Sequence, residues 1–132
     1  MNAVLEERAF LQELCLTVLR VDRNIRFAGV IDGEGKLLVG EYRTDIQSPM
    51  IESSPVKQYD NANSFRASYT ALASLRKPFE SYLGQLNYQL TDYDNIKLVT
   101  IPLTNKNDRY LCSSIDPVKN CQEIISKMLD SI

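Results

Sequence analysis

Acidic side chains are the main groups capable of chemistry here, because the 132-residue chain contains no histidine. Histidine general bases, Ser-His-Asp and Cys-His nucleophile pairs and histidine metal ligands are therefore excluded. The segment 32–35 (Asp-Gly-Glu-Gly) carries two carboxylates near a turn, but a calcium loop needs more oxygen ligands and a distant bidentate glutamate. Asp92, Asp94 and Asp108 could supply acid–base groups, yet they fall on expected turns, where aspartate bonds the local backbone. We therefore expect neither a catalytic site nor a metal site, and we expect that the protein is not an enzyme.

Three basic residues, Arg66, Arg76 and Lys77, share a segment with helical spacing and could hold an anion or a nucleotide against that helix. The alternative is a solvated helix face, since exposed basic residues on helices are common. The sequence has no Gly-x-x-x-x-Gly-Lys or Gly-x-Gly-x-x-Gly motif, so a self-contained phosphate cradle is unsupported. We expect no cofactor, and we name these residues as a candidate interaction or anion surface.

The three cysteines, Cys15, Cys112 and Cys121, form an odd set without C-x-x-C spacing, which does not fit a disulfide framework or a zinc site. Buried free thiols are the expected state, and no adjacent motif supports a redox-sensing Cys121. Charged residues interrupt the apolar run of segment 1–19, so a signal peptide or membrane span is not expected there. These observations predict a cytoplasmic protein.

Length and charge point to one domain over residues 1–132 with no nucleic-acid or membrane partner. The chain has 15 basic and 17 acidic side chains, a net charge of −2, and 44% hydrophobic residues. A weak net field argues against sequence-independent nucleic-acid binding, which depends on neutralising phosphates. The composition is that of a globular protein.

The N-terminal third predicts a helix followed by a β-hairpin. Five apolar residues recur at helical spacing between positions 4 and 21: Leu11, Leu14, Cys15, Val18 and Leu19. Segments 26–32 and 36–42 are short apolar runs on either side of a glycine-containing turn. Both parities of the first run are apolar, so we expect this strand to be covered on both faces.

The central third predicts a long flexible loop over 44–60 and a second helix after it. The loop is rich in proline and serine and lacks periodicity, whereas apolar residues recur at helical spacing from position 65 onward. Pro78 should end or kink the helix, and Gly84 should close a short turn over 79–83.

The last third predicts a meander of three strands over 86–91, 96–103 and 109–115. The first alternates apolar and polar residues, as expected of an edge strand with one wet face, and Pro102 should end the second strand or mark a bulge. Asp116 and Pro117 should begin a final helix as its N-cap and first residue. The order is α-β-β-α-β-β-β-α, an α+β fold with a single sheet.

This order resembles the roadblock family of dynein light chains and bacterial or archaeal GTPase regulators, over nearly the whole chain. Segments 24–32, 35–37, 84–93 and 97–102 are similar to uncharacterised small proteins of ammonia-oxidising archaea. The resemblance implies an archaeal origin and a five-stranded antiparallel sheet in the spatial order 2-1-5-4-3. It implies no activity. Profilin-like domains and sensory domains of the PAS or Cache type share related layouts.

Two expected strands, 26–32 and 96–103, are apolar on both faces, while only three helices are available to cover the sheet. A second copy of the chain would supply the missing cover, although three helices could suffice for a monomer. We therefore predict a non-enzymatic homodimeric scaffold or regulatory interaction module for signalling, and the resemblance implies a small GTPase as its protein partner. The alternative is a small-molecule sensory module in which 44–60 folds over a pocket. A sensor needs an enclosed polar cavity, and a scaffold needs an exposed apolar patch.

Overall fold

The computed structural model describes residues 2–43, 76 and 79–132. The expected loop over 44–60 lies outside these residues. So do Arg66, Lys77 and nearly all of the expected second helix.

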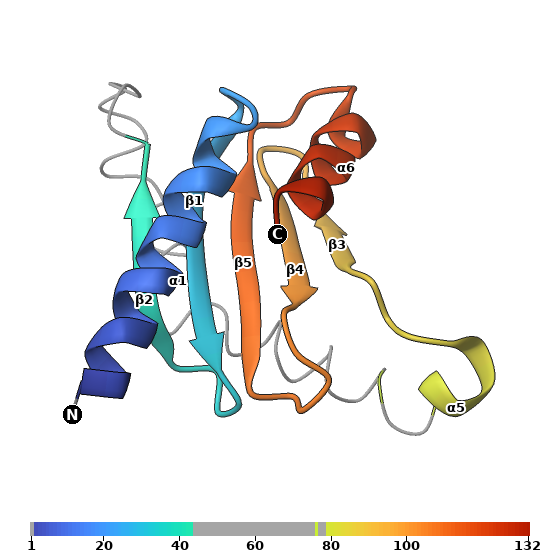
Figure 1. Ribbon diagram of the computed structural model, residues 1–132. Coiled ribbons are helices and arrows are strands. Elements are labelled where there is room, and N and C mark those ends of the chain that lie inside the picture. Colours follow the sequence, from blue (N-terminus) through green and yellow to red (C-terminus); the bar gives the residue numbers. More distant parts are fainter. Residues whose placement is uncertain (1, 44–75, 77–78) are drawn as a thin grey trace.

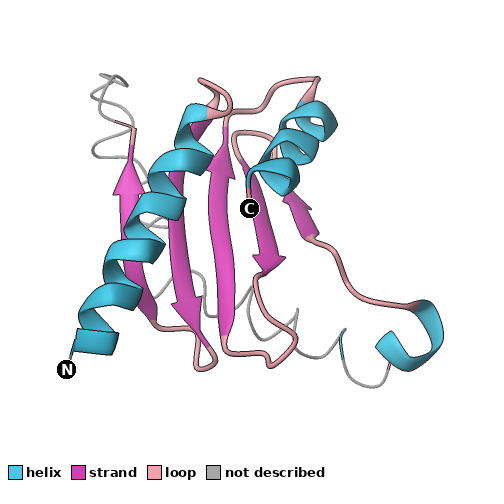
Figure 2. Cartoon of the chain, viewed as in Figure 1, coloured by secondary structure: helices cyan, strands magenta, loops and turns pink. Residues whose placement is uncertain are grey.

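One antiparallel five-stranded sheet forms the centre of the described chain, with its strands in the spatial order β2-β1-β5-β4-β3. The strands are β1 (Ile25–Asp32), β2 (Leu37–Tyr42), β3 (Gln89–Asp92), β4 (Lys97–Pro102) and β5 (Arg109–Ile115). The long helix α1 (Asn2–Arg20) and the C-terminal helix α6 (Cys121–Ser131) lie on the same face of this sheet (Figures 1 and 2). A short helix, α5 (Glu80–Leu83), precedes β3. The predicted fold class, element order and strand order are confirmed.

The helix-covered face of the sheet carries the larger of two buried clusters. Its members include Val18 of α1, Val30 of β1, Val99 of β4 and Met128 of α6, all fully buried. A smaller cluster lies on the opposite face and consists of Phe27, Ile31, Tyr110 and Cys112. The central strands β1 and β5 are therefore buried on both faces, as the apolar residues at both parities of β1 predicted.

Phe27 occupies space that only glycine neighbours leave free. A Cβ atom on Gly29 would lie 2.7 Å from Phe27 Cζ, and one on Gly40 would lie 3.0 Å from the same atom. The ring also packs against Tyr42, with the two ring centroids 4.8 Å apart. Glycine in these two adjacent strands thus makes room for a large aromatic ring on the second face.

The β1–β2 turn uses Asp32 as a local backbone acceptor. Its Oδ1 accepts hydrogen bonds from the amides of Glu34 at 2.8 Å and Lys36 at 3.0 Å, and Gly35 adopts a positive φ of 80°. This is the hairpin turn expected from the sequence.

Two expected boundaries were wrong. The third strand begins at Gln89 rather than at position 86, and α6 begins at Cys121 rather than at Pro117. Asp116 does not cap that helix, because its carboxylate lies 3.7 Å from Arg26 Nε and its amide donates to Asn24 O at 2.9 Å. Asp116 therefore extends the pairing at the end of β5, and Asn120 takes the N-cap position of α6 without a side-chain capping bond.

Other expected ends are confirmed. Gly84, with φ of 92°, follows α5 as its C-cap, Pro102 is the last residue of β4, and β5 has the predicted bounds. None of the described helices is long and apolar enough to cross a membrane.

Replacing Val99 with Asp should destabilise the fold by about 4 kcal/mol or more, because an unpaired carboxylate would enter a fully buried position. Val4→Asp is the matched control, since Val4 is 71% exposed and should tolerate the same change within about 0.5 kcal/mol. Thermal or urea unfolding of both variants measures the difference. Equal stability of the two variants would contradict the placement of β4.

Candidate functional site

Arg76 is buried on the second face of the sheet, with only 2% of its surface exposed. Its Nη1 donates to Tyr110 Oη at 3.4 Å, and the guanidinium carbon lies 6.0 Å from the centre of that ring. The alternative of a solvated basic face therefore does not describe Arg76. An anion surface shared with Arg66 and Lys77 stays a prediction, because those two residues lie outside the described part of the chain.

The carboxylate of Glu80 joins Arg76 to the segment around α5. Arg76 Nε donates to Glu80 Oε1 at 3.2 Å, while Glu80 Oε2 accepts from the amide of Leu86 at 2.8 Å. Tyr110 Oη in turn donates to Asn107 Oδ1 at 2.7 Å. A buried guanidinium needs such charged and polar partners, because desolvating a lone cation is very costly. Through these contacts, Arg76 fixes α5 to strand β5.

Helix α5 turns two large apolar side chains to solvent. Tyr82 is 82% exposed and Leu83 is 80% exposed, and the neighbouring Phe79 is also exposed. Figure 1 places this helix beyond β3, at the margin of the sheet farthest from β2. Contiguous exposed apolar side chains often mark a protein-interaction surface. We call Phe79, Tyr82 and Leu83 the α5 surface.

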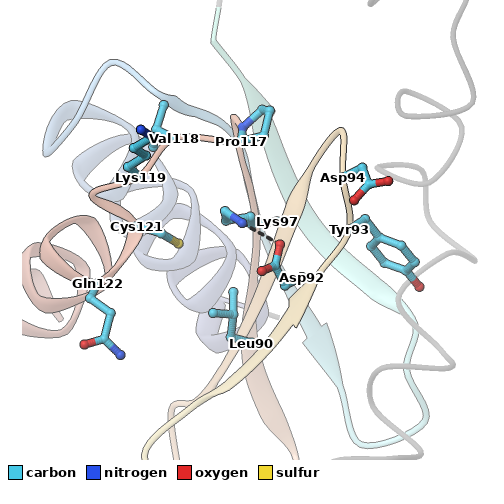
Figure 3. Close-up of a pocket in the computed structure, with 10 residues that line it drawn as sticks. All are labelled: Leu90, Asp92, Tyr93, Asp94, Lys97, Pro117, Val118, Lys119, Cys121 and Gln122. Carbon is cyan, nitrogen blue, oxygen red and sulfur yellow. Dashed lines mark hydrogen bonds and ion pairs between the residues drawn. The ribbon is translucent and has the colours of Figure 1, made fainter.

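A groove of about 490 Å³ lies between the β3–β4 hairpin and the start of α6 (Figure 3). An ion pair between Asp92 and Lys97 lies in its centre, and Lys119 and Asp94 stand on opposite sides. The remaining lining residues are Leu90, Tyr93, Pro117, Val118, Cys121 and Gln122. Because Lys97 is already neutralised by Asp92, the groove has no strong charge of one sign.

Two of the aspartates considered above have local partners. Asp92 binds Lys97, and Asp108 accepts a hydrogen bond from the Thr104 hydroxyl, which lowers the pKa of the Asp108 carboxyl. A lowered pKa stabilises the charged form and does not suit a general acid or base working near neutral pH. The described residues contain no cluster of metal-ligating side chains.

The three thiols are free and buried, as predicted. Burial raises the pKa of Cys15 to about 12 and also raises the pKa values of Cys112 and Cys121. Because the thiolate is the reactive form, these thiols are poor nucleophiles at neutral pH. Cys121 lines the groove, but its chemistry gives the groove no catalytic group.

Comparison with known proteins identifies the architecture. No family model matches the sequence, and no curated protein matches it. Among solved structures, the gliding protein MglB from Thermus thermophilus is similar, with a TM-score of 0.61 at 16% identity, covering 95% of this chain and 85% of that one. A Roadblock/LC7 domain from Streptomyces avermitilis has a TM-score of 0.63 at 13% identity, covering 92% and 90%. The chain has a roadblock-like fold.

A third roadblock-like neighbour, MglC from Myxococcus xanthus, has a TM-score of 0.67 at 8% identity and covers 92% of each chain. Identities this low carry the fold alone. The roadblock layout expected from the order of elements is confirmed, whereas the archaeal origin stays a prediction.

Sequence reasoning named Arg76 but not its contacts, and it missed both the α5 surface and the groove. Phe79, Tyr82 and Leu83 recur at i, i+3 and i+4, a spacing that also suits a buried helix face. Only the position of α5 relative to the sheet distinguishes a buried face from an exposed one.

Replacing Arg76 with Ala should lower the free energy of unfolding by about 2–4 kcal/mol, since it leaves a buried space and removes the partner of Glu80. Arg20→Ala is the matched control, because Arg20 makes only an exposed 3.8 Å pair with Glu13. Urea unfolding measures both variants. A loss of stability no larger than that of Arg20→Ala would show that Arg76 does not anchor α5.

Proposed function

We propose that this chain is a non-enzymatic, cytoplasmic regulatory interaction module, formed by one domain over residues 1–132 and active as a homodimer. The observation that carries the proposal is the α5 surface, which lies beyond β3 at the margin of the sheet farthest from β2. The Arg76–Glu80 ion pair holds this helix in place while the helix buries none of its own residues, so its apolar side chains are accessible to a partner. A second copy is the economical partner, because two-fold homodimers are the commonest oligomers. One solved MglB has a tetrameric arrangement, so assembly of copies occurs among the structural neighbours.

A second exposed apolar surface lies on α1, on the side of the molecule away from β3 (Figure 1). It consists of the adjacent exposed residues Val4 and Leu5, near the start of the helix, and we call it the α1 surface. Two separate apolar surfaces suit a module that binds its own copy at one and a different protein at the other. The resemblance of the sequence to roadblock GTPase regulators makes a small GTPase the partner that we propose for the α1 surface.

The openness of the groove beside α6 favours this function over a small-molecule sensor. The groove is exposed to solvent, and its central charges already pair with each other. A sensor of the kind considered above needs an enclosed cavity with converging polar groups. Interaction through exposed surfaces is the better supported role.

The wild-type protein should have twice its 15.0 kDa chain mass at micromolar concentration. The double variant Tyr82→Glu/Leu83→Glu should shift it toward the single-chain mass, because two carboxylates would enter the apolar contact. The matched control is Val4→Glu/Leu5→Glu, which changes two exposed apolar residues on α1 and should remain dimeric. Size exclusion with light scattering measures all three proteins. A wild-type mass of 15.0 kDa at every concentration would overturn the homodimer.

The same two double variants also test the GTPase partner. Here the α1 variant, and not the α5 variant, should lose binding. Purified small GTPases of the same organism, loaded with GDP or a non-hydrolysable GTP analogue, should include one that binds the wild-type protein. Val4→Glu/Leu5→Glu should weaken this binding at least about tenfold while the protein stays dimeric. Isothermal titration calorimetry measures the affinity. Unchanged binding by this variant would exclude the α1 surface, and failure of every GTPase to bind would remove the proposed partner.

A further inference from the structure

The outer edge of β2 is open among the described strands, because β1 is its one neighbour in the sheet. The amide of Arg43 donates to Arg26 O at 2.9 Å, so these two residues form a hydrogen-bonded pair. Hydrogen-bonded and non-hydrogen-bonded pairs alternate along an antiparallel ladder. Glu41, two positions before Arg43, therefore directs its backbone groups toward β1. Gly40 and Tyr42 direct theirs outward, and both residues are exposed.

Little in β2 itself prevents another strand from pairing with this edge. Edge strands are commonly protected by shortness, by charge or by proline. β2 has six residues, contains no lysine or proline, and carries its one charge at Glu41. A shift in the pairing register with β1 falls near the start of β2, so the part from Val39 to Tyr42 is regular. β2 is therefore able to accept a further strand.

One flank of α1 forms a wall above this edge. Arg8 Nη1 donates to Leu38 O at 3.5 Å, whereas Glu7 pairs with Arg109 of β5 at 3.0 Å. Arg8 therefore lies on the β2 flank of the helix, and Glu7 lies on the opposite flank. Leu5 is three positions before Arg8, so it shares the β2 flank, and it is 60% exposed. Because α1 packs against β2 (Figure 1), a strand added there would have an apolar side chain above it.

The α1-covered face of this edge also favours a basic residue in the added strand. A Cβ atom on Gly40 would point at the Phe27 ring on the second face, so Glu41 belongs to the α1-covered face. No cation of the described residues pairs with the half-buried Glu41 carboxylate. Arg43, two positions further on, donates instead to three backbone carbonyls at the end of α1 and the start of β1. A lysine or arginine beside Glu41 would supply the missing counter-charge.

We infer that the β2 edge binds an extended segment of a partner protein as an added strand. Its backbone bonds the outward groups of Gly40 and Tyr42, a basic residue lies beside Glu41, and apolar residues at alternate positions lie under α1. The edge adjoins the α1 surface at Leu5, so one partner can occupy both. The inference goes beyond the proposed function, because it requires neither a homodimer nor a GTPase.

Hydrogen exchange measured by NMR tests this edge with a defined probe, a capped peptide of alternating threonine and valine with lysine at the central valine position. In the free protein, the amides of Gly40 and Tyr42 should exchange faster than the amide of Glu41, which bonds β1. Peptide at ten times its Kd should slow exchange at Gly40 and Tyr42 about tenfold. The same peptide with glutamate in place of lysine is the control and should bind at least about tenfold more weakly, because like charges would be adjacent.

Tyr42→Pro removes one outward amide, and proline is tolerated in an edge strand where that amide would face solvent. Tyr42→Ala is the matched control, because it removes the same ring from Phe27 and keeps the amide. The lysine peptide should bind Tyr42→Pro at least about tenfold more weakly than Tyr42→Ala. Should Tyr42→Pro fail to fold, the exchange measurement on the wild-type protein decides. Equal binding by the two folded variants, no binding at millimolar peptide, or binding that leaves exchange at Gly40 and Tyr42 unchanged would overturn the inference.

Discussion

The pairing of β1 with β5, buried on both faces, is the constraint on which the rest of the structure depends. All residues of β1 from Ile25 to Ile31 are buried, and β5 is buried from Tyr110 onward. Backbone amides and carbonyls in such a position cannot bond water, so they must pair on both sides. β2 and β4 satisfy these groups, and each face must then be covered by apolar side chains. The large ring of Phe27 meets this requirement on the second face only because Gly29 and Gly40 leave room for it.

Contacts of Arg76 with this core also determine the position of the α5 surface. The hydroxyl of Tyr110, on buried strand β5, is an acceptor beneath the second face, and the Arg76 guanidinium donates to it. The charge requires a counter-ion, which Glu80 supplies, and Glu80 also accepts from the Leu86 amide. Because Glu80 lies in the first turn of α5, neutralising a buried cation fixes the helix that exposes Tyr82 and Leu83. The surface is thus positioned by core electrostatics and not by helix propensity, which is weak for four residues.

Elements with local signals could be predicted from the sequence, and features set by long-range contacts could not. The bounds of β5, the Gly35 turn and the end of β4 at Pro102 follow from residue types within a few positions. The start of α6 did not follow, because Asp116 pairs with Arg26, ninety positions earlier in the chain, and is lost to helix capping. The groove likewise lies between the β3–β4 hairpin and the first turn of α6. No residue spacing in the sequence predicts that these two segments are close in space.

Among the described residues, β3 is an edge strand that is both short and charged. Proteins commonly guard edge strands by keeping them short or charged, and β3 has four residues with Asp92 at its end. Such protection prevents indiscriminate pairing but permits pairing with a complementary edge. The carboxylate of Asp92 already pairs with Lys97 of β4, so pairing that buries it against an apolar strand is disfavoured at this edge.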